Sequence, residues 1–233
     1  MTIGIGVICD SGNSIILASD TRASYDEPQL APNDQTGKMF DLPHEFRATI
    51  AGTIIYCGGV VSQLYTEFTK LPQPFFQDHV RIAMNNARFY ERDFRASERM
   101  REHIGLTLPQ WQTGPLDHRV YRLGKAILKC TTIDVAILVA GFSNGGVTLL
   151  RSCAGQPIEQ FDSFSVVGSG WEKALNRLNK RGQQAHFGLA RSLIHTAEAL
   201  RDSQRTDKAI GPFDYPNVIR LNENQYFQQI VLK

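Results

Sequence analysis

Apolar residues follow two different spacings along this chain, and the two alternate in blocks. Runs of roughly four to eight apolar residues bounded by turn formers are typical of strands, and apolar residues three and four positions apart are typical of helices. The first pattern predicts strands over residues 3–9, 14–19, 38–42, 46–50, 131–140, 147–153, 164–167, 217–221 and 228–232. The second predicts helices over residues 58–71, 75–103, 171–180 and 184–200. Turn chemistry separates strands at residues 10–13 and 141–146.

Three stretches fit neither pattern well. Residues 25–37 are rich in turn formers and predict a loop, and residues 106–125 predict an insertion or long loop for the same reason. Residues 88–102 are dense in charge inside a predicted helix, which is typical of a solvated helix face.

The predicted elements come in the order strands, helix pair, strands, helix pair, strands. Separate strand and helix blocks within one chain favour an α+β fold, in which sheets pack together and helix pairs lie outside them. We find no repeat, low-complexity tract or linker, so we expect one domain over residues 1–233.

Composition and charge narrow the classes of partner. The 233 residues are 42% apolar and 21% charged, with a net charge of +2, which is too small to indicate a nucleic-acid or anionic-membrane partner. No apolar run approaches the roughly 20 residues that span a bilayer. The N-terminus lacks the basic region and cleavage site of a signal peptide. We therefore expect a cytoplasmic protein.

The cysteines and histidines do not form a metal-binding pattern. The four cysteines are far apart, and each lies in or beside an apolar run, which favours buried free thiols. They are Cys9, Cys57, Cys130 and Cys153. The six histidines show no spacing that matches a zinc site, so we expect no metal and no cofactor.

Thr2 is the first candidate for chemistry. Removal of Met1 by an aminopeptidase would leave Thr2 with a free α-amine beside its own hydroxyl. Such an amine has an ordinary pKa of about 7.7–8.0 and can act as a base near neutral pH. One residue would then carry both nucleophile and general base. Many proteins begin Met-Thr, so Thr2 alone does not establish this role.

Four further features stand at strand ends or glycine turns. Asp20 and Arg22 close a strand, Lys38 follows a glycine turn, and Ala51-Gly52 and Gly168-Ser169-Gly170 each lead from a strand towards a helix. Each has an ordinary alternative: a surface ion pair, a solvated lysine, or glycines that simply end an element. Their order and setting together make them candidates for one site.

In this order the motifs resemble those of the proteasome β-type N-terminal threonine peptidases, and the resemblance covers most of the chain. That family has a mature threonine opening the first strand, a strand ending Asp-x-Arg, a strand-borne lysine, an Ala-Gly oxyanion turn, a Gly-Ser-Gly segment and a late Arg-Asp-Ser element. The matching segments are Thr2, Ser19-Asp20-Thr21-Arg22, Gly37-Lys38, Thr49-Ile50-Ala51-Gly52, Val167-Gly168-Ser169-Gly170 and Leu200-Arg201-Asp202-Ser203. The chain is most similar to the stand-alone bacterial proteasome homologues.

The resemblance implies the αββα sandwich of the N-terminal-nucleophile hydrolases and a role for each matched residue. Thr2 would attack a peptide carbonyl, Lys38 would supply positive charge, and Asp20 would orient Lys38. The N–H of Gly52 would donate to the oxyanion. Ser169 and Asp202 would hydrogen-bond around the α-amine.

The resemblance also implies a mainly apolar substrate pocket, with a modest preference for apolar or aromatic residues before the scissile bond. The matched positions are Thr21, Arg22, Ala23, Phe40, Ile50 and Ile54.

The chain departs from the family pattern in two places. The family often has a serine three residues after the late aspartate, where this chain has Arg205, with Ser203 or Thr206 as substitutes. Residues 206–216 also exceed the usual spacing.

For assembly, the resemblance implies a threonine-type endopeptidase acting on peptides or unfolded polypeptides inside a homo-oligomer of stacked rings. A regulatory ATPase partner is not identified. Residues 58–103 are candidate contact surfaces, or equally the outer layer of a monomer. No propeptide is expected before Thr2, so activation would need only the removal of Met1.

Two other functions remain open. One is a catalytically silent structural ring subunit: the intact set of site residues argues against it, and a retained Met1 would enforce it. The other is a small-molecule amidase on the same fold. Many such enzymes use an N-terminal cysteine, but Cys9 lies too far inside the first strand for that.

Overall fold

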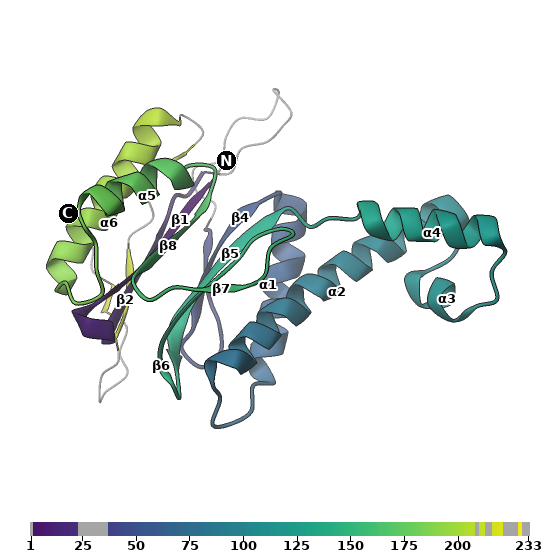
Figure 1. The fold of residues 1–233 in the computed structure, drawn as a ribbon, viewed down its shortest axis with the longest axis horizontal. Helices are drawn as coiled ribbons and strands as arrows, with labels where there is room; N and C mark the ends of the chain where they lie inside the picture. The colour runs from purple at the N-terminus through teal and green to yellow at the C-terminus, as the bar shows by residue number, and fades with distance from the viewer. Residues whose placement is uncertain (1, 23–36, 208–209, 213–215, 221–227, 230–233) are drawn as a thin grey trace.

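Two antiparallel sheets face each other, and helices cover the outer face of each sheet (Figure 1). The computed structural model describes residues 2–22, 37–207, 210–212, 216–220 and 228–229. Within them each sheet has five strands. This is the α+β sandwich that the block order of the sequence predicts.

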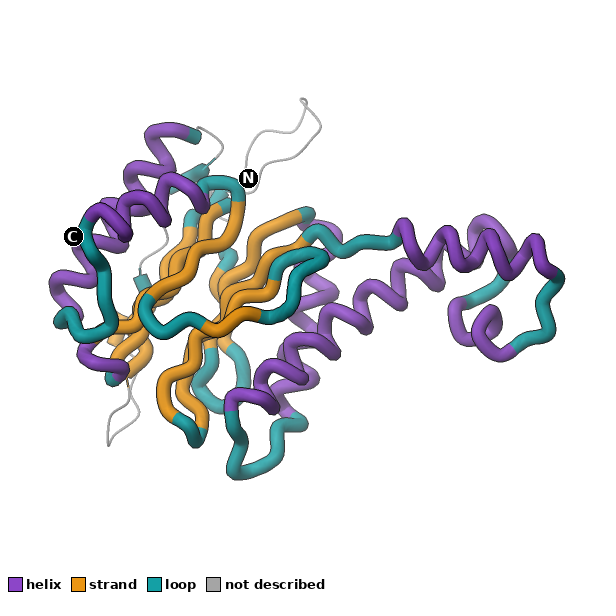
Figure 2. Tube along the Cα trace, viewed as in Figure 1, coloured by secondary structure: helices purple, strands orange, loops and turns teal. Residues whose placement is uncertain are grey.

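The first sheet has the strand order β10-β9-β2-β1-β8. Its strands are β1 (Ile3–Cys9), β2 (Ser14–Ser19), β8 (Phe164–Gly168), β9 (Asn217–Arg220) and β10 (Gln228–Gln229). A short 3-10 turn, η1 (Asp10–Gly12), joins β1 to β2. Helices α5 (Trp171–Lys180) and α6 (Leu189–Thr206) cover its outer face (Figure 2).

The second sheet has the order β3-β4-β5-β6-β7. Its strands are β3 (Met39–Asp41), β4 (Arg47–Gly52), β5 (Val135–Ser143), β6 (Gly146–Ser152) and β7 (Glu159–Gln160). Helices α1 (Ile54–Thr69) and α2 (Gln77–Ile104) lie on its outer face. Both helix pairs therefore lie outside the sheets.

β1 is buried on both faces, because its side chains point alternately to the helices and to the second sheet. Ile3, Ile5 and Val7 pack in the cluster under α5 and α6. Gly4 and Gly6 point the other way, because a Cβ at either would lie 2.6 Å from a side-chain atom of the second sheet. The glycines let the two sheets approach closely beside the N-terminus.

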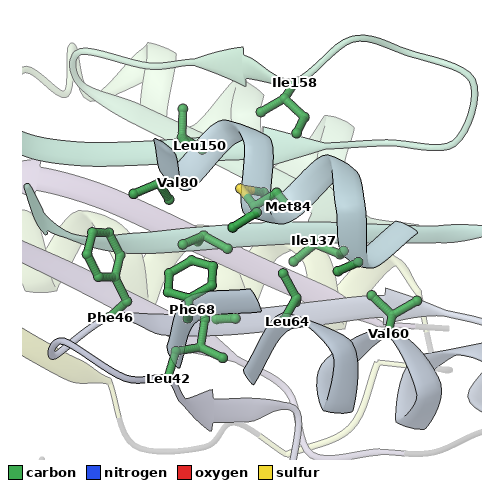
Figure 3. Packing of buried hydrophobic residues seen from close by; sticks show 14 of the residues in the cluster. Leu42, Phe46, Val60, Leu64, Phe68, Val80, Met84, Ile137, Leu150 and Ile158 are labelled. Carbon is green, nitrogen blue, oxygen red and sulfur yellow. The ribbon is translucent and has the colours of Figure 1, made fainter. Parts of the chain in front are cut away.

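A second apolar cluster fills the space between the second sheet and α1 and α2 (Figure 3). Leu64 and Phe68 of α1 and Met84 of α2 meet Phe46 and Ile137 of the sheet side, and all five are fully buried. The Phe46 and Phe68 rings contact edge to face with centroids 5.4 Å apart. Apolar residues one helical turn apart therefore fix both helices against the sheet.

The prediction of a long loop over residues 106–125 is wrong. Helices α3 (Leu108–Thr113) and α4 (His118–Cys130) occupy that region and form, with the end of α2, an arm that projects beyond the sandwich (Figure 1). The turn formers begin helices instead. The Thr107 side chain accepts from the backbone of Gln110, and Asp117 accepts from the first N–H groups of α4.

Element boundaries differ elsewhere. The strand predicted from residue 131 begins at Val135, because Thr131 ends α4 and donates its hydroxyl to the Ile127 carbonyl at 2.8 Å. The turn predicted at 141–146 is shorter, since β5 runs to Ser143 and β6 starts at Gly146. The charged face of α2 is not wholly solvated, because Glu91 is buried and pairs with Arg95.

The cysteines are free, but the prediction that all are buried is wrong. Cys9 is buried, Cys57 and Cys153 are half-buried, and Cys130 is exposed at the end of α4. Burial raises the pKa of the Cys9 thiol to about 12 and that of Cys57 to about 11. No helix in the described part of the chain is long and apolar enough to cross a membrane.

Candidate active site

Thr2 and Lys38 meet at the N-terminal end of β1. The Lys38 ammonium nitrogen Nζ donates to Thr2 Oγ1 over 2.8 Å. Both residues are buried, with 8% of Thr2 and 6% of Lys38 exposed. The sequence separates them by 36 positions, so only the fold brings the hydroxyl to the cation.

Asp20 holds Lys38 from the other side. Both of its carboxylate oxygens lie 3.0 Å from Lys38 Nζ, and the carboxylate is fully buried. Asp20 also accepts from the backbone N–H groups of Ile3 at 2.9 Å, Arg22 at 3.2 Å and Gly211 at 3.2 Å. A buried carboxylate with this many donors is well satisfied as an anion.

Strand pairing places these three residues. β1 and β2 are antiparallel, with Gly4 opposite Ser19, so Asp20 at the end of β2 reaches the start of β1. Lys38 directly precedes β3, and its carbonyl accepts from the Ile50 N–H of β4 at 3.2 Å. The backbone carbonyl of Arg22 accepts a further hydrogen bond from Lys38 Nζ. The ammonium is thus fixed by both sheets.

The charge state of Lys38 reflects two opposing effects. Burial lowers the pKa of its ammonium below 10.5, and the charge and hydrogen bonds of Asp20 act in the opposite direction. Burial is the larger effect. The position of Lys38 beside a hydroxyl therefore gives a cation whose proton is held less tightly than that of a solvated lysine.

The two glycines that the resemblance places in the site have conformations that other residues rarely adopt, and Gly168 contacts Thr2. Gly168 has φ +96°, and a Cβ on it would lie 2.0 Å from the Thr2 carbonyl oxygen. Gly52 has φ +139° at the end of β4, and a Cβ there would lie 2.2 Å from the Asp134 carbonyl oxygen. Gly52 itself is exposed. Both strand ends therefore require glycine.

Ser169 lies beside Asp207, an acid that none of the sequence motifs marks. Its hydroxyl donates to Asp207 Oδ2 at 3.2 Å. Asp202, which the resemblance places near the α-amine of Thr2, forms a partly buried ion pair with Arg177 of α5. Ser203 is buried, and its hydroxyl lies 3.1 Å from the Gly170 carbonyl oxygen. The structure thus brings Ser169 together with Asp207 and turns Asp202 towards Arg177.

One sequence signal could have found Asp207. It is the residue that caps the C-terminus of α6, where the helix dipole disfavours negative charge. An aspartate that costs helix stability in this position is a candidate for another role. It falls within the segment 206–216, which reads as an insertion from sequence alone.

The predicted pocket residues do not all lie in one place. Ile50 is buried in the cluster under α1 and α2, Phe40 packs against that cluster, and Ile54 is 47% exposed. Thr21 is engaged internally, since its N–H and hydroxyl both donate to the Pro212 carbonyl, at 2.9 and 3.2 Å. Ala23 lies outside the described residues.

Comparison with known proteins identifies the fold. No family model matches the chain, and no curated protein matches it. Among solved structures, the eukaryotic HslV from Trypanosoma brucei is similar, with a TM-score of 0.56 and 15% sequence identity. The match covers 94% of this chain and 99% of that one. The chain therefore shares with HslV its fold, in which two antiparallel sheets lie between layers of helices.

Proposed function

We propose that this chain is a threonine-type endopeptidase of the proteasome type, and that Thr2 becomes its nucleophile when Met1 is removed. The observation that carries the proposal is the 2.8 Å contact between Lys38 Nζ and Thr2 Oγ1, with Asp20 bonded to the same ammonium. A hydroxyl beside a buried cation is favoured in its ionised form.

In the first step, Thr2 Oγ attacks the carbonyl carbon of a peptide bond. Its proton passes to the α-amine of Thr2, directly or through a water molecule, and from there to the leaving amine as the C–N bond breaks. The Lys38 ammonium stabilises the developing negative charge on Oγ. Asp20 keeps that ammonium in place.

The second step releases the product. The first step leaves an ester between Thr2 Oγ and the acyl part of the substrate. A water molecule attacks this ester with the same amine as base, the C–O bond to Thr2 breaks, the amine returns the proton to Oγ, and the acyl part leaves as a carboxylic acid. In both steps the carbonyl oxygen becomes an oxyanion, to which we assign the N–H of Gly52 as donor. One such donor is typically worth about 3 kcal/mol. Gly52 is exposed at the end of β4, where a substrate can approach it.

Ser169 and Asp207 are the residues that we assign to the α-amine. Gly168 packs on the Thr2 carbonyl, so Ser169 follows directly after a residue in contact with the nucleophile. The Asp207 carboxylate, bonded to the Ser169 hydroxyl, would favour a charged amine and so support its action as a base. In this assignment Asp207 takes the role that the resemblance implies for Asp202.

The substrates and the assembly follow from the same proposal. Ile50 is buried, so we assign the apolar contact with substrate to the exposed Ile54 and the half-buried Phe40, which would favour peptides with an apolar or aromatic residue before the cleaved bond. We also propose a single domain that assembles as a cytoplasmic homo-oligomer of stacked rings. Large apolar side chains exposed on α1 and α2, such as Ile55 at 62% and Ile82 at 56%, support burial against other subunits.

The decisive experiment compares peptidase activity of the wild type with three variants on fluorogenic peptides. Thr2→Ala and Thr2→Val, which lack the hydroxyl, should lose activity, whereas Thr2→Ser should keep a measurable part of it. Mass spectrometry of each N-terminus must show that Met1 is absent. Equal activity in wild type and Thr2→Val would disprove the mechanism. A wild-type chain that retains Met1 and is inactive would identify a silent structural subunit instead.

A further inference from the structure

A cavity lies away from Thr2, where the projecting arm joins the sandwich. It has a volume of about 670 Å³ and lies between α2, α4, residues 131–133 and residues 154–156. None of the residues that surround Thr2 lines it. Cavities of roughly 300–1,000 Å³ are typical of small-molecule sites.

The charge of this cavity is all of one sign. Four of its lining residues are cationic, Arg88 and Arg92 from α2 and Lys125 and Lys129 from α4, and none is acidic. Lys125 and Lys129 are exposed and lie one helical turn apart on α4. Such a set of cations attracts anions.

Arg88 is the partly buried cation of this set that has no carboxylate partner among the described residues. It is half-buried, and its guanidinium donates to the Ser152 hydroxyl at 2.5 Å. Within the described residues no carboxylate pairs with it, whereas the neighbouring Arg92 pairs with Asp93 at 2.7 Å and Arg95 with Glu91 at 2.8 Å. Burial lowers the pKa of Arg88, because a charge is less favourable when it is partly removed from water. A bound anion would offset this cost of burial.

The walls between the cations are apolar. Phe89 is 52% exposed at the cavity, with the Arg92 guanidinium 5.0 Å from the centre of its ring, and Leu128 and Ile133 complete this side. An inorganic anion would leave these walls in contact with water. A ligand that uses the whole cavity must carry an apolar body as well as a negative charge.

We propose that this cavity binds a small organic anion, whose carboxylate or phosphate contacts Arg88 and whose apolar body packs on Phe89. Lys125 and Lys129 at the rim attract the ligand from solution. Recognition combines a charge-assisted hydrogen bond in a partly desolvated place with burial of apolar surface. The proposal is independent of peptidase activity at Thr2.

Isothermal titration calorimetry on the full chain can test this with matched probes. 2-Naphthoate and 1-naphthyl phosphate carry the charge, and 2-naphthamide and 1-naphthol are their neutral counterparts. We expect at least one anion to bind one site per chain, about tenfold or more tightly than its neutral counterpart. The stronger of the two anions distinguishes carboxylate from phosphate as the natural group. Equal binding of anion and neutral counterpart, or no binding of any probe, would overturn the proposal.

Variants place the anion in the cavity. Arg88→Met should weaken binding about tenfold or more. The double variant Lys125→Met with Lys129→Met should also weaken binding, and because both lysines are exposed, these substitutions should leave the fold intact. Arg81→Met is the matched control, because Arg81 lies on the same helix, outside the cavity, and pairs with Asp78. Unchanged affinity in both cavity variants, or an equal loss in Arg81→Met, would contradict the assignment.

Discussion

Asp20 holds Lys38 through both of its carboxylate oxygens, each 3.0 Å from Nζ, and only 8% of the Lys38 side chain and none of the Asp20 side chain is exposed. Thr2, Ile3, Arg22 and Gly211 all bond to one or other member of this pair. The pair therefore links the start of β1, the end of β2 and the segment after α6. Its loss should disturb folding as well as chemistry.

Removing one member of this pair should destabilise the protein strongly. Lys38→Met leaves the buried Asp20 carboxylate without its cation, which typically costs about 3–5 kcal/mol of unfolding free energy. Urea denaturation measures the change. Lys70→Met is the control, because Lys70 pairs with Glu67 at an exposed site where such pairs are worth about 1 kcal/mol or less. Equal losses in the two variants would show that the Asp20–Lys38 pair adds no special stability.

Asp207 rather than Asp202 should affect catalysis. Asp207→Asn keeps the size of the side chain but removes the charge beside Ser169, so the turnover number should fall about tenfold or more. Asp202→Asn weakens only the ion pair with Arg177 and should leave turnover within about twofold. Steady-state kinetics on the same fluorogenic peptide decides. The reverse order of effects would return the role to Asp202.

The elements beside the site are largely predictable from sequence, because their signals are local. β1 and β2 are short apolar runs separated by turn formers, and α5 begins and ends at the predicted residues. For the arm, composition could not distinguish a loop from a pair of helices. The residue types of Thr107, Pro109 and Asp117 are common both in turns and at the starts of helices. Met100 of α2 and Leu108 of α3 are buried in the same apolar cluster. This packing, which depends on the fold, selects helices instead of a loop.

In the candidate site, too, some residues are predictable from the sequence and others are not. Thr2, Asp20 and Lys38 carry recognisable motifs, and the structure brings them together. The partner of Ser169 depends on where α6 ends and how the chain turns after it, which no short motif specifies. Asp202 lies in the matching motif, but its side chain is on the face of α6 that contacts Arg177 of α5. The motif does not specify which face of the helix the aspartate occupies.

Gly52 should not tolerate a side chain. Gly52→Ala places a Cβ 2.2 Å from the Asp134 carbonyl oxygen at φ +139°, so the backbone must shift at a cost of about 1–3 kcal/mol. The shift also moves the N–H that we assign to the oxyanion. Gly58→Ala is the matched control: it lies inside α1 with open space around it and should stabilise the protein by about 0.5–1 kcal/mol. Thermal melting and peptidase assays on both variants measure the contrast. A Gly52→Ala chain as stable and as active as wild type would refute the assignment.

His195 should make stability depend on pH below neutrality. Its ring is buried on α6, with Nδ1 2.8 Å from Gln183 Oε1, and burial, together with the charges of Arg191 and Arg181, lowers its pKa below 6.5 despite the opposite effect of Glu198. As the pH falls through 6.5, the unfolded chain therefore binds a proton before the folded one does, and the free energy of unfolding decreases.

The urea midpoint should therefore fall more between pH 7.5 and pH 5.5 in the wild type than in His195→Gln. His118→Gln, which alters an exposed histidine on α4, should keep the wild-type dependence. An identical pH dependence in wild type and His195→Gln would mean that this ring titrates alike in the folded and unfolded chain, and that burial on α6 leaves its proton affinity unchanged.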